Sequence, residues 1–309
     1  MTTSAIIQPG EIERPAGEIP FLHIPERDWI FRDRAGRLRT LAQGHTMKDF
    51  LLFAASICDA QQTALHTFPD VPLPPDAQLK LCREHGMPPL SVQSWLRDPV
   101  WQEALSLITA QVKEEANPVV RETLARLQQM DSTSLEATAD AILSARYESI
   151  DLAAAPFVAA ALQVYWTHMA TTLGDRAFGR SDVTHLCPVC ASHPVSSIVR
   201  IGGAEQGLRY LSCSLCETQW HMVRVKCSNC ESTKGISYLM IECTPGAVKA
   251  ESCDECGSYL KIMYMEKDQH VDPVADDLAT LALDLMMGDS GMLRSGPNLF
   301  LMTVSDPAA

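Results

Sequence analysis

The sequence predicts an α+β protein with a helical N-terminal domain, two tandem ribbon-like metal-binding modules and a C-terminal helix. Three observations predict this fold class. Apolar residues recur at steps of three and four across residues 26–173, which is the spacing of one helix face. Four Cys-x-x-Cys pairs follow within residues 187–256, separated by short strand-like runs. A shorter helical pattern covers residues 273–287, within a C-terminal helix and tail over residues 271–309.

The first element expected is a disordered lead-in over residues 1–22. Its sequence is mostly polar, rich in proline and glycine, and has no basic segment followed by an apolar run, so it is unlike a targeting peptide. The longest apolar run elsewhere, residues 152–162, is interrupted by Pro156 and is too short to span a bilayer. We therefore expect a cytoplasmic protein with no membrane insertion.

Residues 23–180 are expected to form an α-helical domain. Its helices are expected near residues 26–42, 46–66, 90–113, 118–130, 134–148 and 157–173. Helix-ending residues separate them, among them Gly44, Gly174 and the proline-rich run 69–75. A domain of roughly 150 residues is large enough to bury a core of its own.

The first of these helices carries five arginines among apolar residues: Arg27, Arg32, Arg34, Arg37 and Arg39. One interpretation is a solvated face whose charges pair with acidic residues of the same segment, namely Glu26, Asp28 and Asp33. The alternative is a positive groove that takes an acidic or extended peptide of a partner.

The cysteine pairs form an internal duplication. A shift of forty residues places the first two pairs, Cys187/Cys190 and Cys213/Cys216, on the last two, Cys227/Cys230 and Cys253/Cys256. Two such pairs facing each other supply four thiolates at the corners of a tetrahedron. We therefore expect one metal ion in each half of the repeat, held by Cys187, Cys190, Cys213 and Cys216 in the first and by Cys227, Cys230, Cys253 and Cys256 in the second.

The two halves define two modules, residues 181–226 and 227–270. Strand-like runs lie between and after the cysteine pairs, at residues 197–201, 208–211, 220–225, 236–241 and 259–264. A module of about forty residues buries too little apolar surface to fold unaided, so the ion is expected to hold it together. Four thiolates suit zinc and iron alike, and the spacing does not choose between these metals.

Composition and spacing argue against a disulfide-linked fold, against nucleic-acid binding and against enzyme activity. An odd total of eleven cysteines argues against a disulfide framework. The net charge of −13, with no basic cluster interleaved with aromatic residues, argues against nucleic-acid binding. Closed four-thiolate sites leave no open coordination position, and the chain has no recognisable nucleophile–base arrangement, so we expect no enzyme activity. Paired carboxylates such as Asp276 and Asp277 are interpreted as solvated helix faces.

The chain resembles the family of the formate dehydrogenase accessory protein FdhE. The resemblance is carried by CPVC at 187–190, CSLCETQWHMVRVKCSNC at 213–230 and CDECGSYLK at 253–261. The helical portion adds RAGRLRTLA at 34–42 and FLLFAASICDAQ at 50–61. It therefore covers most of the chain.

The resemblance implies a cytoplasmic accessory or maturation factor that binds the catalytic subunit of respiratory formate dehydrogenase and is required for its activity. It also implies two rubredoxin-like modules that bind two iron ions per chain, with the same eight cysteines as ligands. Two alternatives stay open: a rubredoxin-like electron-transfer protein, and a zinc-ribbon adaptor whose metal is only structural. Nothing in the sequence predicts an oligomeric state.

One departure from the rubredoxin pattern concerns the residue after each cysteine pair. Rubredoxin-like turns read C-x-x-C-G, and only Gly257 matches, because Ala191, Glu217 and Glu231 follow the other three pairs. Glycine at this position allows a backbone conformation that donates N–H groups to sulfur. Its absence at three of the four turns argues against centres built as efficient electron carriers.

Overall fold

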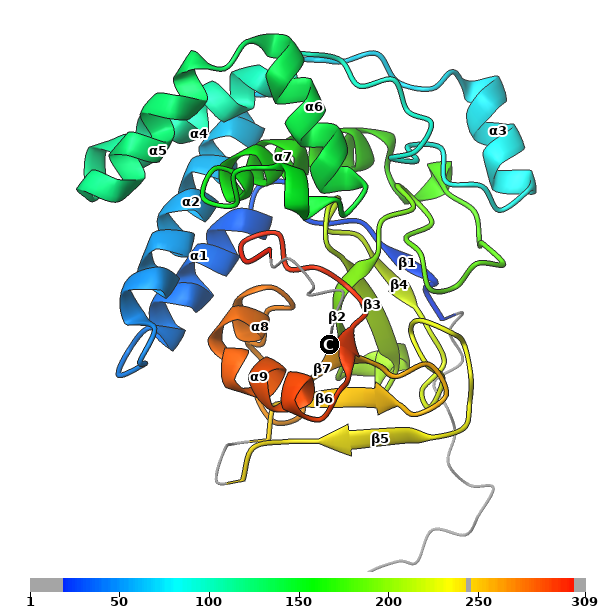
Figure 1. Cartoon of the computed structure of the whole chain (residues 1–309). Helices are drawn as coiled ribbons and strands as arrows, with labels where there is room; N and C mark the ends of the chain where they lie inside the picture. The colour runs from blue at the N-terminus through cyan, green and yellow to red at the C-terminus, as the bar shows by residue number, and fades with distance from the viewer. Residues whose placement is uncertain (1–18, 243–245, 303–309) are drawn as a thin grey trace, which may run out of the picture.

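The computed structural model describes residues 19–242 and 246–302 and confirms the predicted α+β class. Helices α1 to α7 lie in one half of the molecule, with α3 apart from the others at the right of the view, and the strands with α8 and α9 form the other half (Figure 1). Residues 1–18 of the predicted lead-in and residues 303–309 of the predicted tail lie outside the described residues. Among residues 19–242 and 246–302, no helix combines the length and apolar character that a membrane span requires.

The helical half contains α1 (Ile30–Leu41), α2 (Lys48–His66), α3 (Asp76–Glu84), α4 (Trp101–Glu115), α5 (Pro118–Gln129), α6 (Ser132–Leu143) and α7 (Ala155–Leu173). Two of them begin at capping side chains: Asn117 accepts from the N–H of Val120, and Asp131 accepts from the N–H of Ser134. Helix α7 is buried on nearly every side and packs against α2, α4 and α6, so it is the centre of this half.

The predicted helices of this half are wrong in two places: one helix is missing from the prediction, and another begins too early. Helix α3 lies just after the proline-rich run, in a segment where the sequence predicted no helix. The helix predicted over residues 90–113 begins only at Trp101, and residues 90–100 are irregular. The cause is tertiary, because the backbone N–H groups of Leu90 and Val92 donate to the carbonyls of Val189 and Cys190 and are not available to a helix.

The strands form one sheet: β1 (Leu22–His23), β2 (Pro194–Val199), β3 (Arg209–Cys213), β4 (Gln219–His221), β5 (Ile236–Leu239), β6 (Val248–Cys253), β7 (Ser258–Tyr264) and β8 (Leu293–Arg294). Its order is β1-β4-β3-β2-β7-β6-β5, with β8 also on β7. Within each module the strands pair antiparallel, whereas β2 of the first module pairs parallel with β7 of the second, Ser197 opposite Ile262. The two modules therefore share a continuous sheet.

The predicted C-terminal helix is two short helices, α8 (Ala275–Ala279) and α9 (Leu281–Asp289). The break falls at Thr280, where the buried ammonium of Lys261 donates to the carbonyls of Asp277 and Thr280 at 2.8 and 3.1 Å. The same two carbonyls accept backbone N–H groups three residues further on, from Thr280 and Leu283, which is the tighter hydrogen-bond pattern that ends an α-helical run. Asp276 and Asp277 are 3% and 2% exposed, so the interpretation of this pair as a solvated face is wrong.

A single cluster of buried apolar residues extends from the helices into the first module. It includes Val189 and Leu215, which lie inside the first and second Cys-x-x-Cys turns, and all four cysteines of that module. Leu90 connects the two parts, because its carbonyl accepts from the indole N–H of Trp166 of α7 at 2.9 Å and its own N–H donates to the carbonyl of Val189 at 3.0 Å. The first module is therefore packed as part of the helical half.

Candidate metal centres

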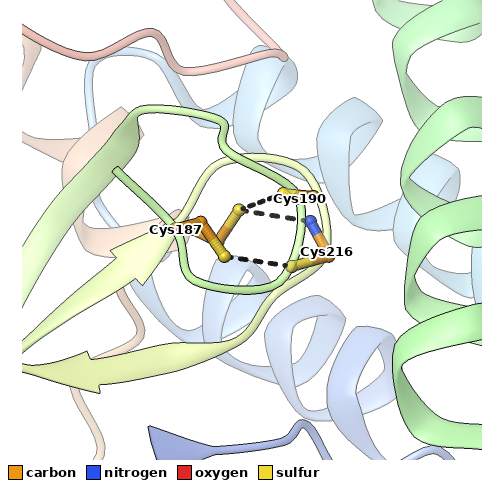
Figure 2. A group of neighbouring side chains, drawn as sticks. Cys187, Cys190 and Cys216 are labelled. Carbon is orange, nitrogen blue, oxygen red and sulfur yellow. Dashed lines mark hydrogen bonds between the residues drawn. The ribbon is translucent and has the colours of Figure 1, made fainter. Parts of the chain in front are cut away.

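The first group of cysteines comes together where two turns of the chain face each other (Figure 2). Cys187, Cys190, Cys213 and Cys216 have sulfur atoms that all lie within 4.8 Å of one another. The Sγ atoms of Cys187 and Cys216 are 3.5 Å apart, and those of Cys190 and Cys213 are 3.4 Å apart. The second cysteine pair begins at the end of β3 and the first precedes β2, so the antiparallel pairing of these strands brings the turns together.

The second group repeats this arrangement forty residues later. Cys227, Cys230, Cys253 and Cys256 also have sulfur atoms within 4.8 Å of one another. The Sγ distances are 3.7 Å for both Cys227–Cys256 and Cys230–Cys253. The structure thus groups the cysteines within each module, as the repeat predicts, and places Cys213 and Cys227 in separate groups.

Each group has the dimensions that a tetrahedral ion requires. Metal–sulfur bonds of about 2.3 Å in a tetrahedron place the sulfurs about 3.8 Å apart. The observed distances of 3.4 to 3.7 Å are within a few tenths of an ångström of that value. Four thiolates form a complete donor set, so each group could hold one metal ion in a closed site.

Backbone N–H groups point at sulfur in both centres. In the first, Leu215 and Cys216 approach the Sγ of Cys213, each at 3.4 Å. In the second, Asn229 and Cys230 approach the Sγ of Cys227 at 3.3 and 3.5 Å. Such donors stabilise thiolate charge and tune the properties of a bound ion.

The backbone conformation that glycine would allow is present at all four turns. Ala191, Glu217, Glu231 and Gly257 have φ values of 61°, 62°, 62° and 63°. The absence of glycine at three of the turns therefore does not remove the conformation on which the argument against electron carriers rested. The left-handed conformation costs such a residue roughly 1–2 kcal/mol, and the surrounding structure must supply that energy. At Glu217 and Glu231 the carboxylates make ion pairs, which offset the cost.

Arg34 of α1 holds the turn of the first centre from the helical half. Its guanidinium donates two hydrogen bonds to the carboxylate of Glu217, at 2.9 and 2.6 Å, and a third to Asp272 at 3.2 Å. The Arg34 and Glu217 side chains are 1% and 4% exposed. Burial raises the pKa of Glu217, and the guanidinium of Arg34 offsets part of that rise.

A second arginine of α1 is anchored to the C-terminal segment. Arg37 donates to both oxygens of Asp276, at 2.9 and 2.6 Å, and to Asp268 at 2.6 Å. These partners lie more than 230 residues away in the chain. The interpretation that this face pairs with acids of its own segment is therefore wrong for Arg34 and Arg37, which connect α1 to the sheet half instead.

Arg32 has a different environment on the same helix. It is exposed, and its guanidinium lies 4.1 Å from the ring centre of Trp29, which is itself 45% exposed. Arg32 and Arg37 border a hollow of about 880 Å³ between α1 and residues 269–272. A hollow therefore lies beside the segment for which a positive groove was the alternative interpretation, and its lining includes Asp33 and Asp59 as well as the exposed cation of Arg32.

The fold and the site define a class of protein: a helical bundle packed on a mixed sheet that carries two four-cysteine centres. Family models for FdhE match nearly all of the chain. They are "FdhE, N-terminal" over residues 19–181, "FdhE, central domain" over 186–224 and "FdhE, C-terminal domain" over 225–301. This chain belongs to the FdhE family.

Individual relatives agree with that assignment. A protein FdhE homolog of Edwardsiella ictaluri is 48% identical over 288 residues, which are 92% of each chain. A homolog of Pseudomonas aeruginosa is 43% identical over 302 residues, covering 96% of this chain and 97% of that one. The crystal structure of the FdhE protein from Pseudomonas aeruginosa matches with a TM-score of 0.85 at 41% identity, covering 93% of this chain and all of the other.

Proposed function

We propose that this chain is a cytoplasmic accessory factor that binds the catalytic subunit of respiratory formate dehydrogenase and is required for its activity. It carries one iron ion in each four-cysteine centre, with all eight paired cysteines as ligands, and performs no turnover chemistry of its own. The observation that carries the proposal is family membership along almost the entire chain, with both sets of four cysteines complete.

The hollow along α1 is where we place the contact with the subunit. Arg32 lines this hollow and stacks on the exposed Trp29 beside it, and aromatic and arginine side chains dominate the binding energy of many interfaces. Arg37 and Arg34 fix the orientation of the helix but are occupied by internal carboxylates. An acidic or extended segment of the subunit would meet Arg32 as its main cationic partner.

Binding is tested with the purified catalytic subunit and this chain immobilised. Wild type is expected to retain the subunit, and Arg32→Glu to weaken binding at least about tenfold, because a buried contact to this cation would become a repulsion. Arg121→Glu on α5 is the matched control. Arg121 is exposed, and its substitution changes the charge by the same amount at a site away from the hollow. Absence of binding by wild type would defeat the proposed function. Binding by Arg32→Glu as tight as that by wild type would show only that the subunit contacts another surface of this chain.

The requirement for activity is tested in cells that lack this chain. Formate dehydrogenase activity is expected to be absent and to return with the wild-type gene. Metal identity is tested on protein purified without oxygen, because ferric ion bound to four thiolates is coloured and zinc is not. A colourless protein with two zinc ions would favour an adaptor with structural metal.

Electron transfer is the second candidate function, and one observation favours it. Left-handed φ after every cysteine pair and N–H donors to sulfur in both centres are features that tune an iron centre. Reversible reduction of the iron in a voltammogram, with a shift when the subunit binds, would support this candidate over a purely structural role.

A further inference from the structure

The two groups of cysteines differ in how far solvent reaches them. In the first group the four cysteines are each 1% exposed or less. In the second group Cys227 and Cys253 are buried, Cys256 is half-buried and Cys230 is exposed. The duplication has therefore produced one enclosed centre and one open centre.

The helical half encloses the first centre from two sides. Backbone N–H groups of Leu90 and Val92 donate to the carbonyls of Val189 and Cys190, at 3.0 and 2.9 Å. On the other turn, Gln163 of α7 donates its side-chain N–H to the carbonyl of Ser214 at 2.8 Å. An ion in this centre could be reached only after these contacts and the core around them had opened.

Contacts to the second centre come from the edges of its turns. Thr184 donates its backbone N–H to the Glu231 carboxylate at 3.0 Å, and Leu293 of β8 donates to the carbonyl of Gly257 at 2.9 Å. Both contacts reach the residue that follows a cysteine pair and leave the face at Cys230 exposed. The open side of this centre therefore faces water.

The residues between the paired cysteines are also more buried and more apolar in the first centre than in the second. Val189 and Leu215 in the first centre are 0% and 1% exposed and belong to the main core. A shift of forty residues places Asn229 and Glu255 at these positions in the second centre, where they are half-buried and exposed. Apolar side chains thus seal the first centre, and polar side chains keep the second in contact with solvent.

We propose that the second four-cysteine centre is the exchangeable one, which external ligands reach through Cys230, whereas the first keeps its ion while the helical half stays folded. In the exchange an external thiolate or chelator donor bonds to the ion, the bond to the Cys230 sulfur breaks, and that sulfur takes a proton from water. This inference rests on the part of the proposed function that places an ion in each centre and is independent of the partner subunit.

Ion release from the whole chain tests the proposal. Zinc-loaded protein, kept in reductant and shown to hold two ions per chain, is mixed with an excess of the chromophoric chelator 4-(2-pyridylazo)resorcinol. We expect two phases of one ion each, with rates at least about tenfold apart, because the slow ion must wait for the core to open. Urea below the unfolding transition should accelerate the slow phase and leave the fast phase unchanged.

Thiol labelling assigns the phases to the centres without any substitution. Iodoacetamide added at the end of the fast phase should modify the second group of cysteines, led by Cys230, while Cys190 at the equivalent position stays protected. A Cys230→Ser variant should release its fast ion more rapidly and keep the slow phase at the wild-type rate.

Three outcomes would overturn the inference: release of both ions in one phase, equal labelling of both groups, or a fast phase that depends on urea as steeply as the slow one. Fewer than two ions at the start would instead count against the proposed function itself. The two failures are therefore distinguishable within the same experiment.

Discussion

Arg34 and Glu217 form a buried ion pair that connects the first helix of the chain to the turn of the first four-cysteine centre. Two parallel hydrogen bonds join them, and Glu217 directly follows the ligand candidate Cys216. Because Asp272 takes the remaining Nε–H of Arg34, one guanidinium holds the helical half, the cysteine turn and the C-terminal segment together. The metal centre and the helical half should therefore respond to each other's stability.

Breaking this pair should destabilise the chain. Glu217→Gln removes the charge that compensates Arg34, and losing one partner of a buried pair costs about 3–5 kcal/mol. The free energy of unfolding from urea titrations with metal bound measures the effect. Replacing both residues together, as Arg34→Met with Glu217→Leu, should cost less than Glu217→Gln alone, because the charge that loses its partner is then Asp272, which is partly exposed and still accepts from the N–H groups of Val274 and Ala275. A double variant that is as unstable as the single one would contradict this explanation.

Exchanging alanine and glycine between two turns should have opposite effects. Gly257 has φ +63° and open space around an added Cβ, so Gly257→Ala should cost about 1–2 kcal/mol from backbone strain alone. Ala191 is held at φ +61°, so Ala191→Gly should relieve strain and leave stability equal or up to about 1 kcal/mol higher. Thermal unfolding of the metal-loaded variants measures both. Loss of stability in Ala191→Gly comparable to that in Gly257→Ala would contradict the strain argument.

Loss of each centre should have different effects on the helices. Cys227→Ser with Cys230→Ser should leave one ion per chain and most of the far-ultraviolet circular dichroism of the helices. The equivalent Cys187→Ser with Cys190→Ser should also leave one ion but lower the midpoint of helix unfolding, because this centre lies in the shared core. Metal analysis and thermal melts followed by helical circular dichroism measure both. Equal midpoints for the two variants would show that the first centre does not support the helices.

Acid should destabilise the protein through His168, which is only 4% exposed. Burial first, and then the neighbouring Arg27 guanidinium 2.9 Å away, lower the pKa of His168 to about 4. Since the unfolded value is about 6.5, the unfolded chain binds more protons between these limits, and the free energy of unfolding falls as the pH is lowered. Between pH 7 and pH 5 the loss should be about 2 kcal/mol.

A His168→Gln variant isolates this part of the pH dependence. Acid also protonates thiolates in both proteins, so the difference between wild type and variant reports the histidine alone. Urea unfolding at the two pH values measures it, and the variant should lose about 2 kcal/mol less than wild type. The same pH dependence in both proteins would exclude His168 as the cause.

Most of the correct predictions came from the spacing of residues that are close in the sequence, namely the cysteines and the apolar residues of helices. The repeat grouped the cysteines correctly because four ligands around one ion are a constraint within forty residues. Their role as ligands and the limits of the predicted domains stay predictions. The helical periodicity located α1, α2 and α7, but missed α3 and extended α4 backwards over residues that bind the turn at Cys190.

Long-range contacts left no signal in the spacing. The parallel pairing of β2 with β7 uses backbone groups that every residue has, so nothing in the sequence indicated one shared sheet. Asp276 had the pattern of a surface carboxylate, and its burial is explained by hydrogen bonds from Arg37 and from the backbone N–H of Asp272. The difference in exposure between the two centres does have a local signal in the sequence, namely apolar Val189 at the position where the second module has polar Asn229.

The internal partners of Arg34 and Arg37 have a consequence for synthesis on the ribosome. Helix α1 emerges among the first elements, whereas Asp268, Asp272 and Asp276 are translated more than 200 residues later. Domains fold from the N-terminus as they emerge, so in the nascent helical half Arg34 stays uncompensated until Glu217 emerges, and Arg37 until Asp268 and Asp276 emerge. A message truncated before these aspartates would yield a protein in which Arg37 has lost its carboxylate partners and Arg34 has lost Asp272. The first helix of such a protein would lack the contacts that join it to the C-terminal segment.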